Sequence, residues 1–409
     1  MAPDDSFASV VRVNIALLKL SGVVSCGSNK ACQFCSQNIL MVIAYGCLFA
    51  YAGLYTYEFA LYTVYLDTWM ESFAMILSLV GGQARLTIVL LFRDRFQRLL
   101  TICEELWPTL NAIEKTYVRG YVKTTRHLTY YYLFGCAFTI FFYAVASLFL
   151  GQHDGSSNAT TTRTLPYACP VEVHRSPYYE IMYVVQLCSM INVGLTCAGV
   201  DTVGPVLVLT VCGHFKVLNA RLSRINERDS GRKGSRSTSR SAATIVPSRE
   251  RNDHSPENRA KFNLDACVYY HQMMLELCKE VESLTNTIFL TQLLGSTYNV
   301  SLVGFKLVGD DPDKFKYTTQ LLIAVIQLFL CNWAANVLLT ESQDVARAVY
   351  FVPWYHFPYR LRRSVNIIAM RSQKPAQLTA GYIIPLSLQT FASMVSSAAS
   401  FFTMIRSMN

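Results

Sequence analysis

The sequence predicts an all-α membrane protein with seven transmembrane helices, and three observations support that prediction. Hydrophobic residues make up 52% of the 409 residues and charged residues only 15%, whereas soluble proteins carry about 25% charged residues. Seven apolar stretches reach or exceed the roughly 20 residues that a helix needs to cross a bilayer. Lys and Arg are also concentrated in alternate loops, as expected for a membrane protein with a fixed orientation.

The seven stretches differ in how polar they are. The third has no charged residue, the second contains Gln83 and Arg85, and the fourth contains Asp201 and is long enough to extend beyond the bilayer. Ionisable groups inside a membrane are costly and usually face the bundle interior or water. Three interpretations of Arg85 and Asp201 follow. They are functionally coupled groups, they form a structural ion pair, or they lie near the membrane surface. The stretches are residues 38–57, 70–92, 128–150, 179–215, 284–308, 317–340 and 376–405.

The charge distribution predicts which end of the chain lies in the cytosol. The N-terminal tail and the second, fourth and sixth loops carry 29 Lys and Arg residues, against 5 in the other loops and the C-terminus. Basic loops stay on the cytosolic side, so we expect a cytosolic N-terminus without a secretory signal and an extracellular C-terminus. The third loop then lies outside, where the sequon at Asn158 is accessible for glycosylation.

Two cytosolic connections have helical periodicity, and a third segment lacks it. Residues 96–121 and 263–283 place apolar side chains at helical spacing, which predicts amphipathic extensions of the membrane helices. Residues 224–259 are rich in Ser, Arg and Gly without an apolar period, which is typical of disorder. This basic segment is either a solvated insertion or a site for anionic lipid.

Signals of enzyme or metal chemistry are weak. The seven His residues are scattered, and Cys32 and Cys35 form an isolated CxxC pair without a second ligand pair. No HExxH, GxSxG or phosphate-binding loop is present. We therefore expect neither catalysis nor a metal or other cofactor.

One face of the last helix carries serine and methionine at spacings of four and three residues, which is helical spacing. A stripe of small hydroxyl residues has two explanations, which are tight helix packing or a water-filled pore with an apolar gate. The residues alone favour packing. The face consists of Ser393, Ser397, Ser400, Met404 and Ser407, with Met408 one turn beyond.

The C-terminal sequence resembles the signature end of insect odorant receptors. The matching motifs are RSQKP at 371–375, LTAG at 378–381, PLSLQTF at 385–391 and FFT at 401–403. Elsewhere the resemblance rests on the number of helices, the chain length and the inverted orientation. The usual hydroxyl-and-aromatic run of the final helix departs here to Ala398-Ala399-Ser400-Phe401, which puts the pore properties in doubt but not the resemblance.

The resemblance implies a function and its partners. Such receptors are subunits of ligand-gated, non-selective cation channels in the plasma membrane of sensory neuron dendrites, and they form heterotetramers with an odorant co-receptor. A small volatile organic molecule is the ligand, lipid surrounds the helices, and nucleic acid has no role. The final helix lines the pore, so the face that runs from Ser393 to Met408 becomes the pore wall, with the gate at Met404 and Met408.

The implied organisation has five parts, and the odorant pocket lies in the outer half of the second, third, fourth and sixth helices. The parts are a cytosolic segment (1–37), a ligand-binding bundle of four helices (38–215), a basic loop (216–262), two further helices with cytosolic anchor helices (263–375), and the pore helix (376–409). The candidate pocket residues are Trp69, Phe73, Ile76, Thr139, Phe142, Tyr143, Ala146, Tyr179, Tyr183, Gln186, Met190, Gln320, Ala324 and Gln327.

For each candidate taken singly, ordinary helix packing is the competing interpretation. Gln186 and Gln327 stand out because a buried amide needs a hydrogen-bond partner, which is either a polar odorant or a neighbouring helix. Three other functions also compete with the odorant receptor. A gustatory-type channel would share this architecture, a G-protein-coupled receptor would place the N-terminus outside, and a transporter would show an internal repeat that the sequence lacks.

Overall fold

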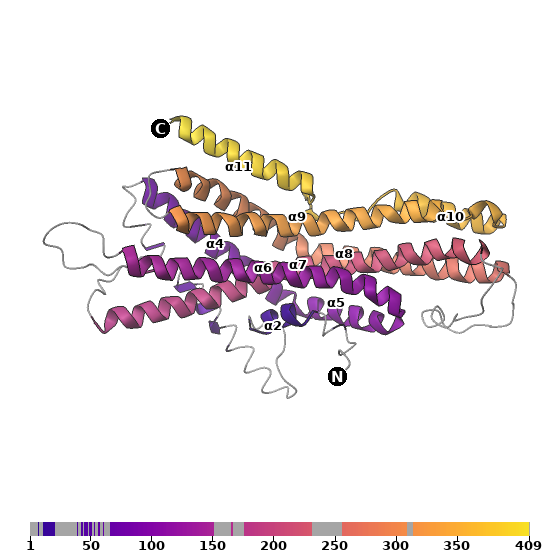
Figure 1. Cartoon of the computed structure of the whole chain (residues 1–409), viewed down its shortest axis with the longest axis horizontal. Helices are drawn as coiled ribbons and strands as arrows, with labels where there is room; N and C mark the ends of the chain where they lie inside the picture. The colour runs from indigo at the N-terminus through magenta and orange to yellow at the C-terminus, as the bar shows by residue number, and fades with distance from the viewer. Residues whose placement is uncertain are drawn as a thin grey trace.

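The structure, a computed structural model, is an elongated bundle of long helices that run side by side (Figure 1). It describes residues 7, 11–20, 66–150, 165–166, 176–230, 256–308 and 314–408, with scattered residues between 39 and 60. The elements are α2 (Arg12–Leu20), α4 (Leu66–Leu91), α5 (Arg93–Leu106), η1 (Trp107–Thr109), α6 (Ala112–Leu150), α7 (Tyr178–Ser230), α8 (Pro256–Val308), α9 (Lys314–Tyr350), η2 (Trp354–His356), α10 (Tyr359–Ser372), β1 (Thr379–Ala380), β2 (Ile384–Pro385) and α11 (Leu388–Met408).

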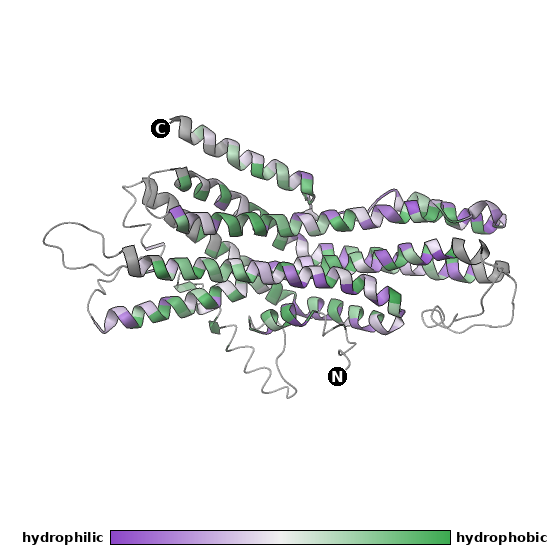
Figure 2. Ribbon diagram, in the orientation of Figure 1, coloured by the Kyte–Doolittle hydropathy of each residue, from purple (hydrophilic) through white to green (hydrophobic). Residues whose placement is uncertain are grey.

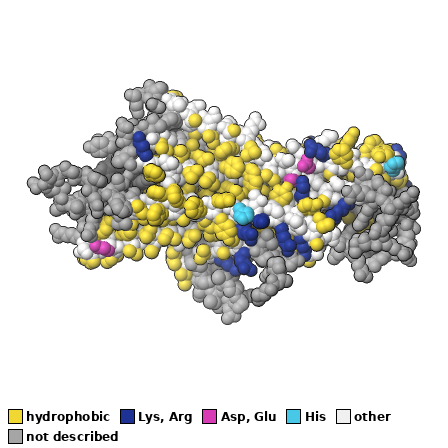
Figure 3. Space-filling model, viewed as in Figure 1, with side chains coloured by type: hydrophobic (Ala, Val, Ile, Leu, Met, Phe, Trp, Pro, Cys, Tyr) yellow, Lys and Arg dark blue, Asp and Glu magenta, His cyan; other side chains and the backbone are white. Residues whose placement is uncertain are grey.

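The four longest helices are each about twice as long as a bilayer requires. Helices α6 and α9 have 39 and 37 residues, and α7 and α8 have 53 each. In Figure 2 these helices are mainly hydrophobic in the half of the bundle that holds the C-terminus, and more hydrophilic in the other half. The space-filling view shows a broad band of hydrophobic side chains over the first half, while most Lys and Arg gather in the second (Figure 3). We call these the apolar half and the polar half.

The predicted stretches correspond to helices where the structure describes them, except that the seventh is helical only from Leu388. Among the described residues, three stretches are long and apolar enough to cross a membrane, namely Ala112–Val145, Tyr178–Ile225 and Tyr317–Tyr350, and a shorter apolar helix covers Leu79–Leu91. The second, fifth and seventh predicted stretches correspond to α4, α8 and α11. Only scattered helical residues of the first are described. One of them, Tyr45, joins α4 through a 2.7 Å hydrogen bond between its hydroxyl and that of Thr87.

The predicted amphipathic helix at 96–121 is broken in the structure. Helix α5 ends at Leu106, η1 follows with Pro108 near its start, and α6 begins at Ala112. A proline cannot donate the backbone hydrogen bond that a continuous helix requires. The backbone N–H of Asn111 instead donates to Glu114 Oε2 at 3.0 Å, which caps the start of α6 in the manner of a capping box.

The segment predicted to be disordered at 224–259 is helical at both ends. Helix α7 continues to Ser230 and α8 begins at Pro256, while residues 231–255 lie outside the described part of the chain. Leu222 and Ile225 remain buried in the core near the end of α7. Burial of these side chains supports a helix beyond the point where the apolar period in the sequence stops.

The last predicted helix begins twelve residues later than expected, because a small hairpin precedes it. Strands β1 and β2 pair antiparallel across a turn, and Gly381 and Tyr382 have φ values of 62° and 60°. A Cβ atom at position 381 would lie 2.7 Å from Leu290 Cδ2 of α8, so both the backbone angle and the space favour glycine. The Gly381 N–H also donates to the Asn286 carbonyl at 3.0 Å. The hairpin is thereby fixed to α8, and α11 begins only at Leu388.

Charged and aromatic side chains join three helices in the polar half. Arg221 of α7 binds Glu114 of α6 through two parallel contacts, Nε to Oε1 at 2.9 Å and Nη2 to Oε2 at 2.8 Å. The same guanidinium lies over the ring of Tyr270 on α8, 4.7 Å from its centre. Bidentate and stacked contacts of this kind suit arginine, because its planar head group matches both partners. The polar half is therefore held by charged contacts as well as by apolar packing.

Candidate functional site

A cavity of about 240 Å³ lies between α4, α6, α7, α8 and α9 in the apolar half. Most of its wall is hydrophobic, and its polar groups gather toward two ends. An apolar cavity of about 150 Å³ holds a benzene ring, so this one has room for a ring with a substituent. The lining residues are Leu77, Leu79, Gly81, Arg85, Tyr132, Cys136, Thr139, Ile140, Tyr143, Met190, Val193, Gly194, Cys197, Asp201, Gly295, Asn299, Gln320, Ile323, Ala324 and Gln327.

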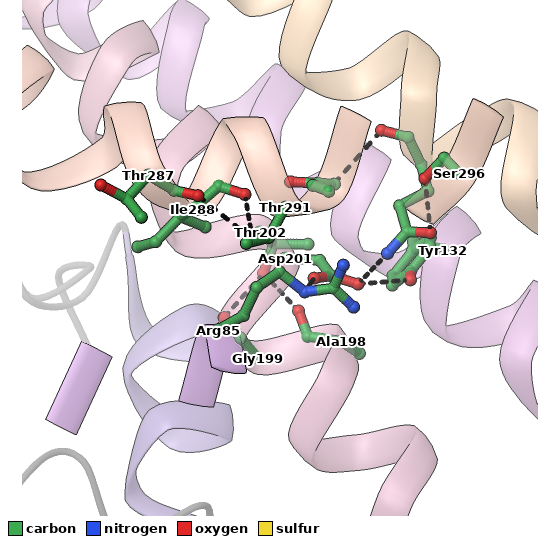
Figure 4. Close-up of polar contacts among 12 residues, drawn as sticks. Arg85, Tyr132, Ala198, Gly199, Asp201, Thr202, Thr287, Ile288, Thr291 and Ser296 are labelled. Atoms are coloured by element: carbon green, nitrogen blue, oxygen red, sulfur yellow. Dashed lines mark hydrogen bonds and ion pairs between the residues drawn. The ribbon is translucent and has the colours of Figure 1, made fainter. Parts of the chain in front are cut away.

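Figure 4 shows a network of polar contacts centred on Asp201, and most of its members line one end of the cavity. The Tyr132 hydroxyl donates to Asp201 Oδ2 at 2.8 Å, and Gln327 Nε2 donates to the same oxygen at 2.5 Å. The Ser296 hydroxyl then donates to Gln327 Oε1 at 2.9 Å. Arg85 Nε lies 3.0 Å from Asp201 Oδ1. We call these five residues the Asp201 network, and they come from α4, α6, α7, α8 and α9.

The central ion pair of this network is buried. Arg85 is 6% exposed and Asp201 is 1% exposed. Removing two charges from water costs several kcal/mol per ion, and the attraction between them offsets that cost only when further hydrogen bonds satisfy the carboxylate. Asp201 Oδ2 has two such bonds, from Tyr132 and Gln327, while Oδ1 faces the Arg85 charge without a hydrogen bond. The pair thus sits in the bundle as one neutral unit that is anchored through Oδ2.

The opposite end of the cavity is closed by a contact between α6 and α9. The Tyr143 hydroxyl donates to Gln320 Oε1 at 3.0 Å, and the Tyr143 ring packs with Met190 in a small apolar cluster that also includes Ile76. Between the two ends the wall is formed by aliphatic side chains such as Ile140 and Ile323. The cavity is therefore an apolar chamber with one charged end and one uncharged polar end, a composition typical of small-molecule sites.

The structure brings six of the predicted pocket residues to the cavity wall and leaves others elsewhere. The six are Thr139, Tyr143, Met190, Gln320, Ala324 and Gln327. Phe142 instead stacks on Phe315 with ring centres 5.7 Å apart, and the Tyr183 hydroxyl donates to the Ala144 carbonyl at 3.0 Å. Tyr179 and Gln186 are buried outside the cavity lining. The side chains of Trp69, Phe73 and Ala146 lie outside the described part of the structure.

Several lining residues were not predicted, and two of them had a sequence signal. Arg85 and Asp201 are ionisable residues in apolar stretches, and such residues usually mark functional positions. Gly295 and Asn299 belong to α8, the fifth predicted membrane helix, which the resemblance did not place around the pocket. Only the helix packing in the structure shows that α8 completes the cavity wall.

Helix α11 exposes the serine face that the sequence predicted. Ser393, Ser397, Ser400 and Met404 are exposed, while the opposite face packs on α8 and α9. Phe391 lies 5.5 Å from Phe329 between ring centres. The exposed serine hydroxyls donate to carbonyls of their own helix, for example Ser397 to Ser393 at 2.8 Å. The side chains of Ser407 and Met408, and the whole of Asn158, lie outside what the structure describes.

Comparisons with known proteins agree on one family. The model of the family described as 7tm odorant receptor matches residues 65–399. Odorant receptor 63a of Drosophila melanogaster is 23% identical over 309 residues, which cover 73% of this chain and 67% of that protein. The structure of the olfactory receptor OR5 of Machilis hrabei aligns with a TM-score of 0.75 at 14% identity, over 98% of both chains. The same receptor in complex with eugenol aligns with a TM-score of 0.72 at 16% identity, again over 98% of both chains.

The Asp201 network leads to a prediction about stability. Replacing Asp201 by Ala leaves the Arg85 charge buried without its partner, which should cost about 3 kcal/mol or more. The double variant R85M/D201N has no buried charge and keeps an acceptor for Tyr132 and Gln327, so its thermal midpoint should lie near that of the wild type. Tryptophan fluorescence of detergent-purified protein during heating measures both. Equal destabilisation of the single and double variants would contradict the ion-pair account.

Proposed function

Because the chain belongs to the 7tm odorant receptor family of insects, we propose that it is the odorant-binding subunit of a ligand-gated, non-selective cation channel. The observation that carries this proposal is the mainly apolar cavity lined by five helices, which also presents a few polar groups. A ligand opens a channel only by binding the open state more tightly than the closed state. The cavity must therefore be coupled to the helix that lines the pore.

Two helices of the cavity wall provide this coupling, because they also hold α11. On α8, Gly295 lines the cavity, and two residues later Thr297 contacts the sulfur of Met394 on α11 at 3.6 Å. On α9, Gln327 lines the cavity, and two residues later Phe329 packs against Phe391 of α11. A ligand that shifts α8 or α9 thus displaces α11 through direct side-chain contacts.

The exposed face of α11 supports its role as the pore wall. In Figure 1 this helix diverges from α9 toward the C-terminus, and its serine face is exposed. Several copies around a central axis would bring these faces together around water. The carbonyl-bonded serines would then line the pore, with Met404 and Met408 forming an apolar gate near the outer end.

We infer the orientation from the distribution of basic residues. The polar half, which contains α5 and α10, lies in the cytosol together with the N-terminus, and α11 ends outside. In this arrangement the polar half forms the anchor domain that holds the subunits of the tetramer together. The chain resides in the plasma membrane of the sensory dendrite, where the odorant co-receptor completes the heterotetramer.

The dimensions of the cavity suit a small volatile ligand. The related Machilis hrabei receptor forms a complex with eugenol, which consists of one aromatic ring with short substituents. The cavity of this chain, at about 240 Å³, has room for a molecule of this class. We propose the six predicted residues on its wall as ligand contacts, joined by Ile140, Val193 and Ile323.

Recordings with and without the co-receptor test the channel proposal. Cells that express both proteins should give odorant-evoked cation currents, and cells that express this chain alone should give none. Equal currents from the chain alone would favour a gustatory-type channel instead. In the co-expressed channel, Met404→Ala should raise the basal current because it removes apolar bulk from the gate. Basal current and permeation identical to the wild type would remove Met404 from the gate.

Antibody access tests the orientation. An epitope tag at the C-terminus should be stained in intact cells, and a tag at the N-terminus should be stained only after permeabilisation. The reverse pattern is the one expected of a G-protein-coupled receptor, and it would exclude both the pore and the outward-facing cavity. Surface biotinylation of each tagged protein controls for expression at the plasma membrane.

Substitution of Gly295 tests the cavity as the ligand site. A Cβ atom at Gly295 meets no atom within 4 Å, so Gly295→Leu should fold while its side chain occupies the cavity. Odorant potency in co-expressing cells should then fall about tenfold or more, because the lost volume excludes the ligand. Gly304→Leu is the matched control, since it has the same open space on the same helix but lies outside the cavity lining. Equal dose responses for all three proteins would rule out the cavity as the ligand site.

A further inference from the structure

The two charged groups at the end of the cavity differ in their hydrogen bonds. Asp201 Oδ2 accepts hydrogen bonds from Tyr132 and Gln327, and Oδ1 faces the Arg85 charge at 3.0 Å. A guanidinium carries five N–H donors and no acceptor. Among the described residues, the polar contact of Arg85 is the Asp201 ion pair, and its buried Nε makes no hydrogen bond. Donors of Arg85 are therefore left over at the cavity wall.

A second unused polar group lies on the same wall. The Thr139 hydroxyl is buried and has no hydrogen-bond partner among the described residues, and Thr139 lines the cavity. Thr139 is seven residues beyond Tyr132 on α6, which places both on the same side of that helix. Buried polar groups normally have partners, so each of these two unused donors marks a position on the cavity lining for an acceptor of the ligand.

We propose that the Arg85 guanidinium recognises an oxygen acceptor on a neutral ligand, such as the carbonyl of a ketone, aldehyde or ester. This inference rests on the proposed odorant site and specifies its ligand class. The hydrocarbon body of the ligand lies among the aliphatic residues in the middle of the cavity, and its oxygen points toward Arg85. Hydrogen bonds from a charged donor are about twice as strong as those between neutral groups, and exclusion of water strengthens them further.

The charge balance of the site excludes two other ligand classes. The Arg85–Asp201 pair is neutral as a whole, so a carboxylate ligand would bring a net negative charge into a buried site, which is costly. An ammonium ligand would bring a net positive charge and would need an acceptor. Asp201 Oδ2 already accepts two hydrogen bonds, and Oδ1 faces the Arg85 charge, which would repel a second cation. A neutral molecule with an acceptor oxygen is the class that uses the free donors without adding charge.

Binding of a matched pair of probes to purified protein tests this assignment. Acetophenone carries a carbonyl, and α-methylstyrene has the same shape with a methylene group in place of the oxygen. Equilibrium dialysis of the detergent-purified full chain gives the affinity for each. The ratio of the two affinities should fall about tenfold or more from the wild type to R85M/D201N. Because both proteins are compared with the same probes, differences in probe hydration cancel.

A merely structural role for Arg85 would change both affinities together, so an unchanged ratio overturns the inference. Absence of binding by both probes also overturns it. Cyclohexanone and methylenecyclohexane provide a second pair, and their ratio should shift in the same direction. Benzoate and benzylammonium should bind at least tenfold more weakly than acetophenone, and tighter binding of either ion would contradict the charge argument.

The outcome separates this inference from the channel proposal. Dialysis requires neither the co-receptor nor gating. A shifted affinity ratio without odorant-evoked current supports the role of Arg85 and contradicts the channel proposal. Conversely, odorant-evoked currents together with an unchanged ratio support the channel and overturn the role of Arg85.

Discussion

The packing of the apolar half depends on one buried carboxylate. Between helices that face lipid there is no hydrophobic driving force, because the acyl chains are as apolar as leucine. Association then relies on close packing and on polar contacts. Asp201 on α7 contacts Arg85 of α4, Tyr132 of α6 and Gln327 of α9, and Gln327 contacts Ser296 of α8. One side chain thereby fixes the relative positions of five helices and also shapes the end of the cavity.

The helices of the polar half are also joined by contacts of one charged side chain. There Arg221 links Glu114 to Tyr270 and so joins three of the same helices. Helix α2 is joined to α6 and α7 close to the Asp201 network, because Asn14 Nδ2 donates to the hydroxyls of Thr129 and Thr202 at 2.9 and 3.1 Å. Thr202 directly follows Asp201 in α7. The long helices are therefore held together at two levels along their length, by the Arg221 contacts in the polar half and by the Asp201 network. The cavity borders the Asp201 network.

Much of the fold followed from local patterns, whereas the cavity did not. The apolar stretches identified α4, α6, α7, α8, α9 and α11. The spacing of serines identified one face of α11, but the residues alone favoured packing for that face, which is exposed in the structure. The hairpin at Gly381 was missed because an apolar run hides the left-handed backbone that a glycine permits. The cavity depends on which helices touch. That arrangement is set by contacts between distant parts of the chain, such as Arg85 with Asp201, and no local period encodes it.

The attachment of α11 has a mechanical consequence. The helix directly follows the hairpin, which is bonded to α8, its N-terminal part packs on α8 and α9, and its 21 residues span about 30 Å at 1.5 Å per residue. A tilt of α11 about the hairpin therefore displaces its C-terminal end more than its N-terminal end. A tilt of about 5° at the base moves the far tip by roughly 3 Å over that length, so sub-ångström adjustments near the hairpin become displacements the width of an ion at the tip.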